Sequence, residues 1–421
     1  MHYLLFFFYL VLFCRLIIRI KFFKNSGMDG RTLVGLFLVR VIAGLINGYI
    51  NLYYYQGTDT AGFQLMGIDE YHLLFHQPAE YFTNIFQSGH QSGYGSFLES
   101  SNSFWNDTRN NIIVKMLSVF DIFSGLNFFI NSLIFNFLIF FGAVGLYRVF
   151  VDILPASRII LMICIFLLPS TVYFSSGIHR DGLIFLSLSM IIYYMYFMIR
   201  RKQYLLRGIL FTLLYISLII LLRNFVFIIL FPALLAWFLA EQKPNYSFWV
   251  FLGVYFFIGT LFFCSGFLPP AFNLPLHVSN RQIDFILIAR RGASAININP
   301  LYPNFRSFLN NLPQALNHSF MRPYLTEHLS FLYTLSGLEI LFYEILIFLF
   351  IFFRKKIVSV YPLIYFCVFL TISTFLAIGY TIPIIGAIVR YRSIYLPFLL
   401  IPVLNYIDWN RLKKLSYSIT S

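Results

Sequence analysis

Charged side chains are scarce in this sequence, and that scarcity limits the class of protein it can encode. Only 11% of its 421 residues are charged, and 59% are hydrophobic. An ordinary soluble domain is about one quarter charged, because its folded surface must be wetted. Too few charges are present here to cover a globular surface of this size, so lipid must solvate much of the chain.

Cysteine pairs and nucleotide-binding motifs are also lacking. The four cysteines lie far apart within apolar stretches, without a C-x-x-C pair, which argues against a disulfide framework or a metal site. They are Cys14, Cys164, Cys264 and Cys367. No G-x-x-x-x-G-K-S/T loop is present, so ATP-driven transport by this chain alone is disfavoured.

The net charge of +14 comes from cations spread over short loops between apolar runs. A protein that reads nucleic acid gathers Lys and Arg on one face or in one motif, so we expect no nucleic-acid partner. The pattern is that of a membrane protein with its cations in the cytoplasm. At the N-terminus, Arg15, Arg19, Lys21 and Lys24 follow the apolar run. A cleaved signal peptide has the reverse order, so we expect a retained helix.

Apolar runs long enough to cross a bilayer, which takes about 20 residues, recur along the chain. They cover residues 33–52, 126–150, 159–174, 183–198, 209–222, 225–240, 248–267, 338–353, 358–378 and 394–406. We therefore predict an all-α polytopic membrane protein with about ten transmembrane helices, or eleven with the N-terminal helix.

The cationic loops all fall on one side if these runs alternate, and that side is predicted to be cytoplasmic. The extracytoplasmic side then receives two long loops, approximately 53–125 and 268–337. In the first loop, Phe63, Met66, Tyr71 and Leu74 recur at helical spacing, which predicts helices on the membrane surface. We predict a single integral membrane domain over residues 1–421.

Acidic residues gather in the first outer loop. Asp59 follows a spanning helix within YYYQGTDTAGF, and Asp69 and Glu70 come next. A carboxyl group over an apolar floor is partly desolvated, which raises its pKa and suits it to accept a proton from an attacking hydroxyl. We predict Asp59 as this base, with Asp69 and Glu70 as alternatives. A turn in Gly-Thr-Asp-Thr also accounts for Asp59.

Two tight outer turns carry further charge. Arg180 and Asp181 lie in SSGIHRDG just before a span, where a helix N-terminus and an Arg suit a phosphate. Simple pairing and capping explain them equally well. Arg223 divides one long apolar stretch in LLRNFVF, and ionisable groups at such depth are usually functional. Snorkelling to lipid headgroups is the structural alternative.

Outer cations recur towards the C-terminus. Arg322 ends the stretch NLPQALNHSFMR in the second outer loop, and Arg390 and Arg392 lie in the last outer turn. Cations on this side oppose the usual charge bias, and an anionic lipid phosphate would explain them. Solvated charge in a long loop and anchoring at the interface are the simpler explanations.

Taken in order, five segments resemble the GT-C-type polytopic membrane glycosyltransferases. They are YYYQGTDTAGF, SSGIHRDG after LPSTVYF, LLRNFVF, NLPQALNHSFMRPYL and VRYRSIYLPFLLIP. Within that group the chain is similar to GT-C-like and polymerase-like proteins of bacterial surface-polysaccharide loci. The resemblance implies an inverting transferase of the bacterial inner (cytoplasmic) membrane, with its active site facing the periplasm.

Such an enzyme moves a sugar from a polyprenyl-(pyro)phosphate-linked donor to a glycan or lipid acceptor during surface glycan assembly. By that likeness Asp59 would be the general base. The residues expected to bind substrate or its lipid phosphate are Arg180, Asp181, Arg223, Arg322, Arg390 and Arg392. No cofactor is required, because a lipid phosphate is a fair leaving group. A divalent ion, Mg²⁺ or Mn²⁺, is compatible with Asp59 and the Asp69, Glu70 pair, although no ligand spacing demands one.

Three other functions use the same features. A polymerase of oligosaccharide repeats, as for O-antigen or capsule, needs the same outer cations and polytopic body. A flippase or transporter of lipid-linked glycans predicts charges near mid-membrane and related halves. Apart from Arg40 inside the first strong span, we expect the charges to cluster at the ends of the spans, and no repeat is apparent. A scaffold subunit would use the loop charges for docking.

Overall fold

Helices make up most of the computed structural model, which describes residues 2–55, 58–88, 104–203, 205–290, 294–327, 331–355 and 360–412. No β-strand occurs within these ranges. The sequence predicts one integral membrane domain, and the contacts between residues group the chain into two compact units. Unit 1 comprises residues 1–156 and 165–227, and unit 2 comprises residues 157–164 and 228–421.

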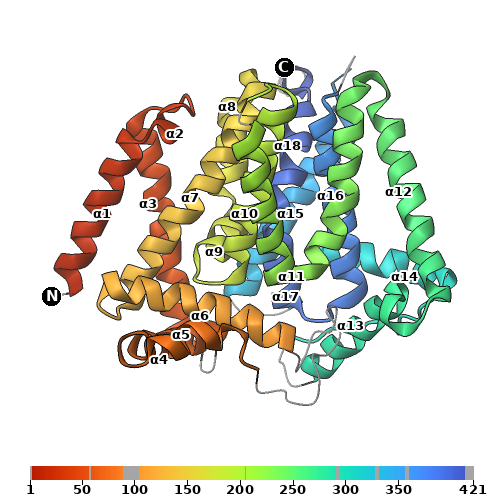
Figure 1. Cartoon of the computed structure of the whole chain (residues 1–421). Coiled ribbons are helices and arrows are strands. Elements are labelled where there is room, and N and C mark those ends of the chain that lie inside the picture. The colour runs from red at the N-terminus through yellow and green to blue at the C-terminus, as the bar shows by residue number, and fades with distance from the viewer. Residues whose placement is uncertain are drawn as a thin grey trace. The chain divides into compact units, whose positions relative to one another are not determined.

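Unit 1 contains the N-terminal helices, coloured red to yellow-green in Figure 1. They are α1 (His2–Arg19), α2 (Lys21–Lys24), α3 (Gly30–Tyr49), α4 (Asp59–His76), α5 (Pro78–Thr83), α6 (Phe104–Ser124), α7 (Phe128–Ile153), α9 (Pro169–Ser176), α10 (Arg180–Ile199) and the first part of α11 (Leu205–Gln242). Its core is α7, which packs against α3 and α10. Because α7 is apolar on all sides, it is buried nearly throughout, as at Phe135, Phe140 and Phe150.

Unit 2 contains the rest of the chain. Its helices are α8 (Arg158–Met162), the second part of α11, α12 (Ser247–Cys264), α13 (Leu274–Ala289), α14 (Phe305–Leu316), α15 (Phe331–Phe352), α16 (Pro362–Thr381), α17 (Ile385–Ser393) and α18 (Leu396–Tyr406). The central helix is α16, which contacts α12, α13, α14 and α18. Its residues Phe366, Cys367 and Leu370 are fully buried.

Within the described residues, 8 helices are long and apolar enough to cross a membrane, or up to 10 if each of two bent pairs is one span. The prediction of an all-α, multi-pass membrane protein is confirmed. The predicted runs 159–174 and 394–406 fall in the two bent pairs, which turn by 46° and 63°. Pro169 and Pro397 lie in the first turn after each bend, and proline lacks the N–H that would continue the preceding helix.

The chain also breaks where the sequence predicts a break between residues 222 and 225. α11 runs for 38 residues, about 57 Å if straight, whereas the bilayer core is only about 30 Å thick. At Arg223 the backbone leaves the helical region, with φ −153° and ψ 86°. The predicted pair of spans therefore corresponds to the two parts of one interrupted helix, and the boundary between the units comes shortly after the break, at Phe227.

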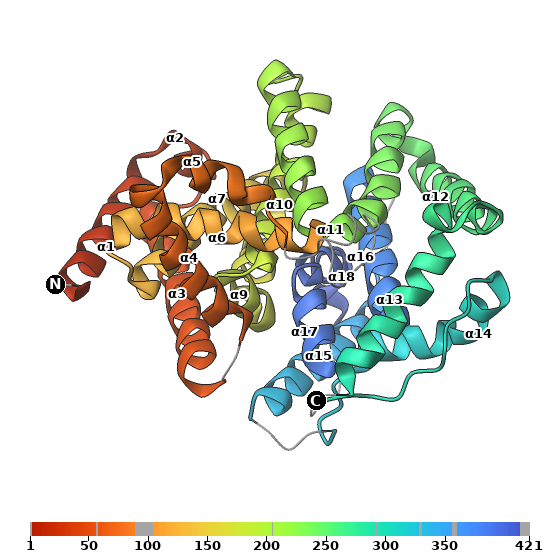
Figure 2. The same cartoon turned by 60° about the horizontal axis from the view of Figure 1, so that its bottom comes forward.

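The described residues of the first predicted outer loop are mainly helical, over residues 59–86 and 104–124, as the periodicity predicts. Helices α4, α5 and α6 lie together across one end of α3 and α7 (Figures 1 and 2). At the other end of α7, the Arg148 guanidinium lies over the rings of Phe22 and Tyr193, and Arg201 pairs with Asp152 at 2.5 Å. The basic turns and the first outer loop therefore occupy opposite ends of unit 1.

Close packing between α16 and α14 gives a test of the fold of unit 2. A Cβ atom on Gly379 would overlap the backbone carbonyl of Ala315, which cannot move without shifting α14. We expect Gly379→Ala to lower the melting temperature of the purified protein by several degrees. The matched control is Gly253→Ala on α12, where a Cβ meets nothing within 4 Å. Equal melting temperatures for the two variants would contradict this packing.

Candidate functional site

The turn between α9 and α10 in unit 1 holds the most concentrated polar chemistry of the described residues. α9 ends at Ser176 and α10 begins at Arg180, so Gly177, Ile178 and His179 join them. Glycine is required on both sides of the turn. A Cβ on Gly177 would overlap the Asn47 side chain, and one on Gly182 would lie 2.7 Å from both the Phe135 ring and the Ser175 carbonyl oxygen.

Side chains from α3 and α7 fix the end of α9. Arg40 is fully buried and donates from Nη2 to the carbonyl oxygen of Ser175 at 3.1 Å and to its hydroxyl at 2.9 Å. Asn136 donates to the carbonyl oxygen of Ser176 at 2.9 Å, and Asn47 to that of Tyr173 at 3.4 Å. The last carbonyl groups of a helix lack partners within the helix, so these donors hold the turn in place.

Four charged or titratable side chains meet at this turn, which we call the His179 cluster. His179 Nε2 lies 3.5 Å from Asp59 Oδ2 at the start of α4, and His179 Nδ1 lies 3.1 Å from Asp181 Oδ2. The other oxygen of Asp181 pairs with Arg223 Nη2 at 2.8 Å. At the break in α11, the Arg223 guanidinium therefore contacts the Asp181 carboxylate of α10.

Exposure changes steeply along the His179 cluster. The side chain of Asp59 is 69% exposed, that of His179 12%, that of Arg223 18%, and that of Asp181 1%. A carboxylate as buried as Asp181 requires a charged or hydrogen-bonding partner, and it has two. Asp59 is the acid of the cluster that solvent reaches, while the buried Asp181 carboxylate contacts the imidazole.

The structure thus brings together Asp59, Asp181 and Arg223 among the residues singled out from the sequence. Arg180 lies beside them and donates a hydrogen bond to the side-chain oxygen of Asn110 on α6. His179 is absent from that set, because a single histidine carries little signal by itself. Its position between two aspartates, one of them 120 residues away in the chain, is what distinguishes it.

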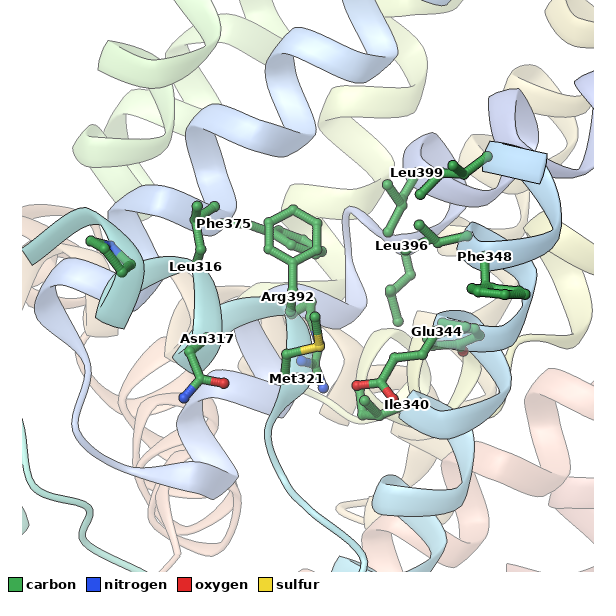
Figure 3. A pocket seen from close by; sticks show the side chains of 15 residues that line it. Leu316, Asn317, Met321, Ile340, Glu344, Phe348, Phe375, Arg392, Leu396 and Leu399 are labelled. Carbon is green, nitrogen blue, oxygen red and sulfur yellow. The ribbon is translucent and has the colours of Figure 1, made fainter. Parts of the chain in front are cut away.

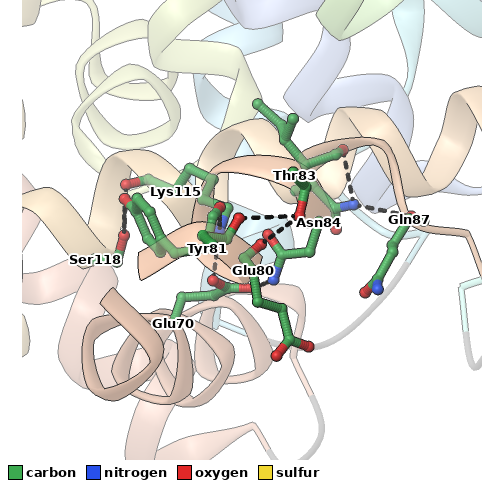
Figure 4. A network of polar contacts seen from close by, with 11 residues as sticks. Glu70, Glu80, Tyr81, Thr83, Asn84, Gln87, Lys115 and Ser118 are labelled. Carbon is green, nitrogen blue, oxygen red and sulfur yellow. Dashed lines mark hydrogen bonds and ion pairs between the residues drawn. The ribbon is translucent and has the colours of Figure 1, made fainter. Parts of the chain in front are cut away.

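The two alternative acids on α4 lie apart from the His179 cluster. Asp69 is exposed, and Glu70 forms an ion pair of 2.5 Å with Lys115 of α6. Figure 4 shows this second network, in which Lys115 also lies 3.6 Å from the centre of the Tyr81 ring and Asn84 donates to Glu70 at 2.7 Å. Glu70 therefore links α4 to α6 and to Asn84, which directly follows α5, so its role is structural.

A buried acid lies beneath these helices. Asp121 of α6 is fully buried, and Asn131 of α7 donates to its Oδ1 atom at 2.7 Å. Burial raises the pKa of the Asp121 carboxyl, while hydrogen bonds from Asn131, Gln64 and Ser124 act in the opposite direction. Burial is the larger effect, so the net change is a raised pKa of the Asp121 carboxyl.

The predicted cations of the C-terminal half lie in unit 2. Arg392 is 2% exposed and donates to the carbonyl oxygens of Ser319 at 2.7 Å and Arg322 at 2.9 Å. Arg322 pairs with Glu327 at 3.0 Å, and the Arg390 guanidinium lies 5.9 Å from the centre of the Tyr391 ring. Arg392 thus also has a structural task, which is to hold the segment before Pro323.

A histidine beside this segment is kept neutral. His318 is 3% exposed, and its burial, with a contribution from the nearby charge of Arg322, lowers its pKa to about 4. Near neutral pH the His318 side chain is therefore uncharged. No group of three or more His, Cys, Asp and Glu side chains converges on a metal-like site within the described ranges.

Comparison with known proteins adds no family assignment. No protein-family model matches the chain, and no curated protein or solved structure shows significant similarity to it.

The raised pKa of Asp121 predicts a specific pH dependence. A group with a raised folded-state pKa contributes stability below its unfolded pKa of about 4 and loses it as pH rises. At about pH 7, Asp121→Asn should therefore melt at the same or a higher temperature than the wild type. Any difference in melting temperature between Asp121→Asn and the wild type should shrink as the pH falls to about 5. Asp69→Asn, an exposed acid on α4, is the control. If Asp121→Asn melts below the wild type and the difference is largest at about pH 7, the pKa of Asp121 is not raised.

Proposed function

We propose that this chain is a membrane glycosyltransferase that uses a polyprenyl-(pyro)phosphate-linked sugar donor in surface glycan assembly. The observation that supports it most is the His179 cluster, in which the reachable acid Asp59 contacts an imidazole that is anchored by Asp181 and Arg223. An acceptor hydroxyl is a poor nucleophile until a base removes its proton, and this arrangement supplies a base with a second proton acceptor behind it.

The proposed reaction is a direct displacement at the anomeric carbon. The acceptor oxygen attacks that carbon while its proton passes to Asp59, and the bond between carbon and phosphate oxygen breaks with its electron pair on the phosphate. In the proposed reaction, His179 donates from Nδ1 to Asp181, so that Nε2, which faces Asp59, shares the proton on Asp59. The proton then leaves to solvent. Arg180 and Arg223 supply positive charge for the departing phosphate.

The same proposal assigns the protein to a bacterial inner membrane with the His179 cluster on the periplasmic side. The basic end of unit 1, with Arg148 and Arg201, would face the cytoplasm, since cytoplasmic loops hold the excess of cations. Partners are the polyprenyl-linked donor, a glycan or lipid acceptor and membrane lipids. No cofactor is needed for the displacement; Mg²⁺ or Mn²⁺ belongs in the reaction mixture as an optional addition.

Replacement of Asp59 tests the proposed base in the native host. Asp59→Asn keeps the size of the side chain but removes its basicity, so glycan formation should fall by about a hundredfold or more, and the polyprenyl-linked precursor should accumulate. Asp69→Asn, on the same helix but outside the cluster, should behave as wild type at equal membrane level. If the glycan profile of Asp59→Asn stays normal while deletion of the whole chain changes it, Asp59 is not the base. The length of the stored precursor separates single-sugar transfer from polymerisation of repeats.

Orientation is tested by labelling with a membrane-impermeant maleimide on intact cells, in a variant without the four native cysteines. Glu80→Cys, on exposed α5, should be labelled because the first outer loop faces the periplasm in the proposal. Gln203→Cys, after α10, should be labelled only once the cells are opened. The reverse pattern would place the His179 cluster in the cytoplasm and remove periplasmic transfer from the proposal.

A further inference from the structure

An apolar cavity of about 620 Å³ lies among the membrane-spanning helices of unit 2. Its volume is within the range of about 300–1,000 Å³ that is usual for sites of small molecules. It is bounded by the end of α14, by α15, by α16 and by the α17–α18 pair (Figure 3). Its apolar walls include Leu316, Ile340, Phe348, Phe375, Leu396 and Leu399.

Two charged side chains line this otherwise apolar space. Arg392 comes from α17, and Glu344 comes from the C-terminal half of α15, a predicted span. Figure 3 shows both side chains reaching the Met321 end of the cavity from opposite walls. Arg392 interacts electrostatically with Glu339 of α15 and, less strongly, with Glu344. Ionisable groups in a span are costly, and they usually face a cavity with a functional ligand.

Neither charge is fully satisfied by the protein. Arg392 Nη1 binds two backbone carbonyl oxygens, but its buried Nε has no hydrogen-bond partner among the described residues. Glu344 forms no ion pair of 4 Å or less within that part of the chain. Glu339, one and a half turns earlier on α15, instead accepts a hydrogen bond from Tyr343 and does not line the cavity.

We propose that this cavity binds an aminophospholipid, with a hydrocarbon chain along its apolar walls, the lipid ammonium at Glu344 and the lipid phosphate at Arg392. A zwitterionic head with N–H donors matches one carboxylate and one guanidinium. A purely anionic lipid would meet the Glu344 carboxylate without a compensating cation, and a quaternary ammonium has no N–H to donate. This site lies in unit 2 and does not depend on the proposed glycosyl transfer.

The test uses the purified full chain in detergent, offered equal amounts of lipids with identical acyl chains, and measures retained lipid by native mass spectrometry. Phosphatidylethanolamine should be retained about tenfold or more over phosphatidylcholine, because a hydrogen bond to a charged group contributes about 1.5–3 kcal/mol. Monomethyl and dimethyl head groups should fall between the two. This series needs no variant, so a folding defect cannot obscure the result.

Variants then locate the effect. Glu344→Gln should bring the ratio of phosphatidylethanolamine to phosphatidylcholine close to one, whereas Glu80→Gln, the same change on exposed α5 in unit 1, should keep the wild-type ratio. Equal retention of all heads by the wild type would overturn the proposal, as would equal effects of the two variants. A polyprenyl phosphate in the same competition is the third arm. If it is retained in preference to phosphatidylethanolamine, the cavity belongs to that lipid and the proposal is wrong.

Discussion

Backbone carbonyl groups at a helix end inside a membrane span must find hydrogen-bond donors in the protein, because hydrocarbon offers none. The end of α9 meets this constraint with donors from Arg40, Asn47 and Asn136 on two other helices. Those bonds determine where the chain leaves α9 and where α10 begins. The position of His179 therefore depends on the spans beneath it rather than on the outer loop.

Across the His179 cluster, the exposure of the side chains to solvent falls from one end to the other. At one end Asp59 is mostly exposed, and at the other Asp181 is buried against Arg223. A charge near the buried end is screened much less by solvent than one at the exposed end. The imidazole lies where the two environments meet, between the exposed and the buried carboxylate.

The fold class was predictable because apolar runs long enough to span a membrane are local features of the sequence. The break at Arg223 was also predictable, since a cation divides a stretch that is too long for one span. Grouping Asp59 with Asp181 and Arg223 required the structure, because these residues are far apart in the chain. Chemistry alone could not separate Asp59 from Glu70, whose partner Lys115 lies 45 residues away. Glu344 was not predicted for the same reason. It lies within an apolar helix, and only the packing of the helices shows which residues surround it.

Arg40 has a consequence for how the protein enters the membrane. Its partner Ser175 lies 135 residues later in the chain, so it is synthesised about 7–27 s after Arg40. Until then α3 carries an unpaired cation in its middle, which costs about 2.5–3.5 kcal/mol on insertion. The insertion machinery, or the early neighbours α1 and α7, must retain α3 during that interval. The hydrogen bonds of Arg40 on α3 can therefore form only after α9 has been synthesised, long after α3 has entered the membrane.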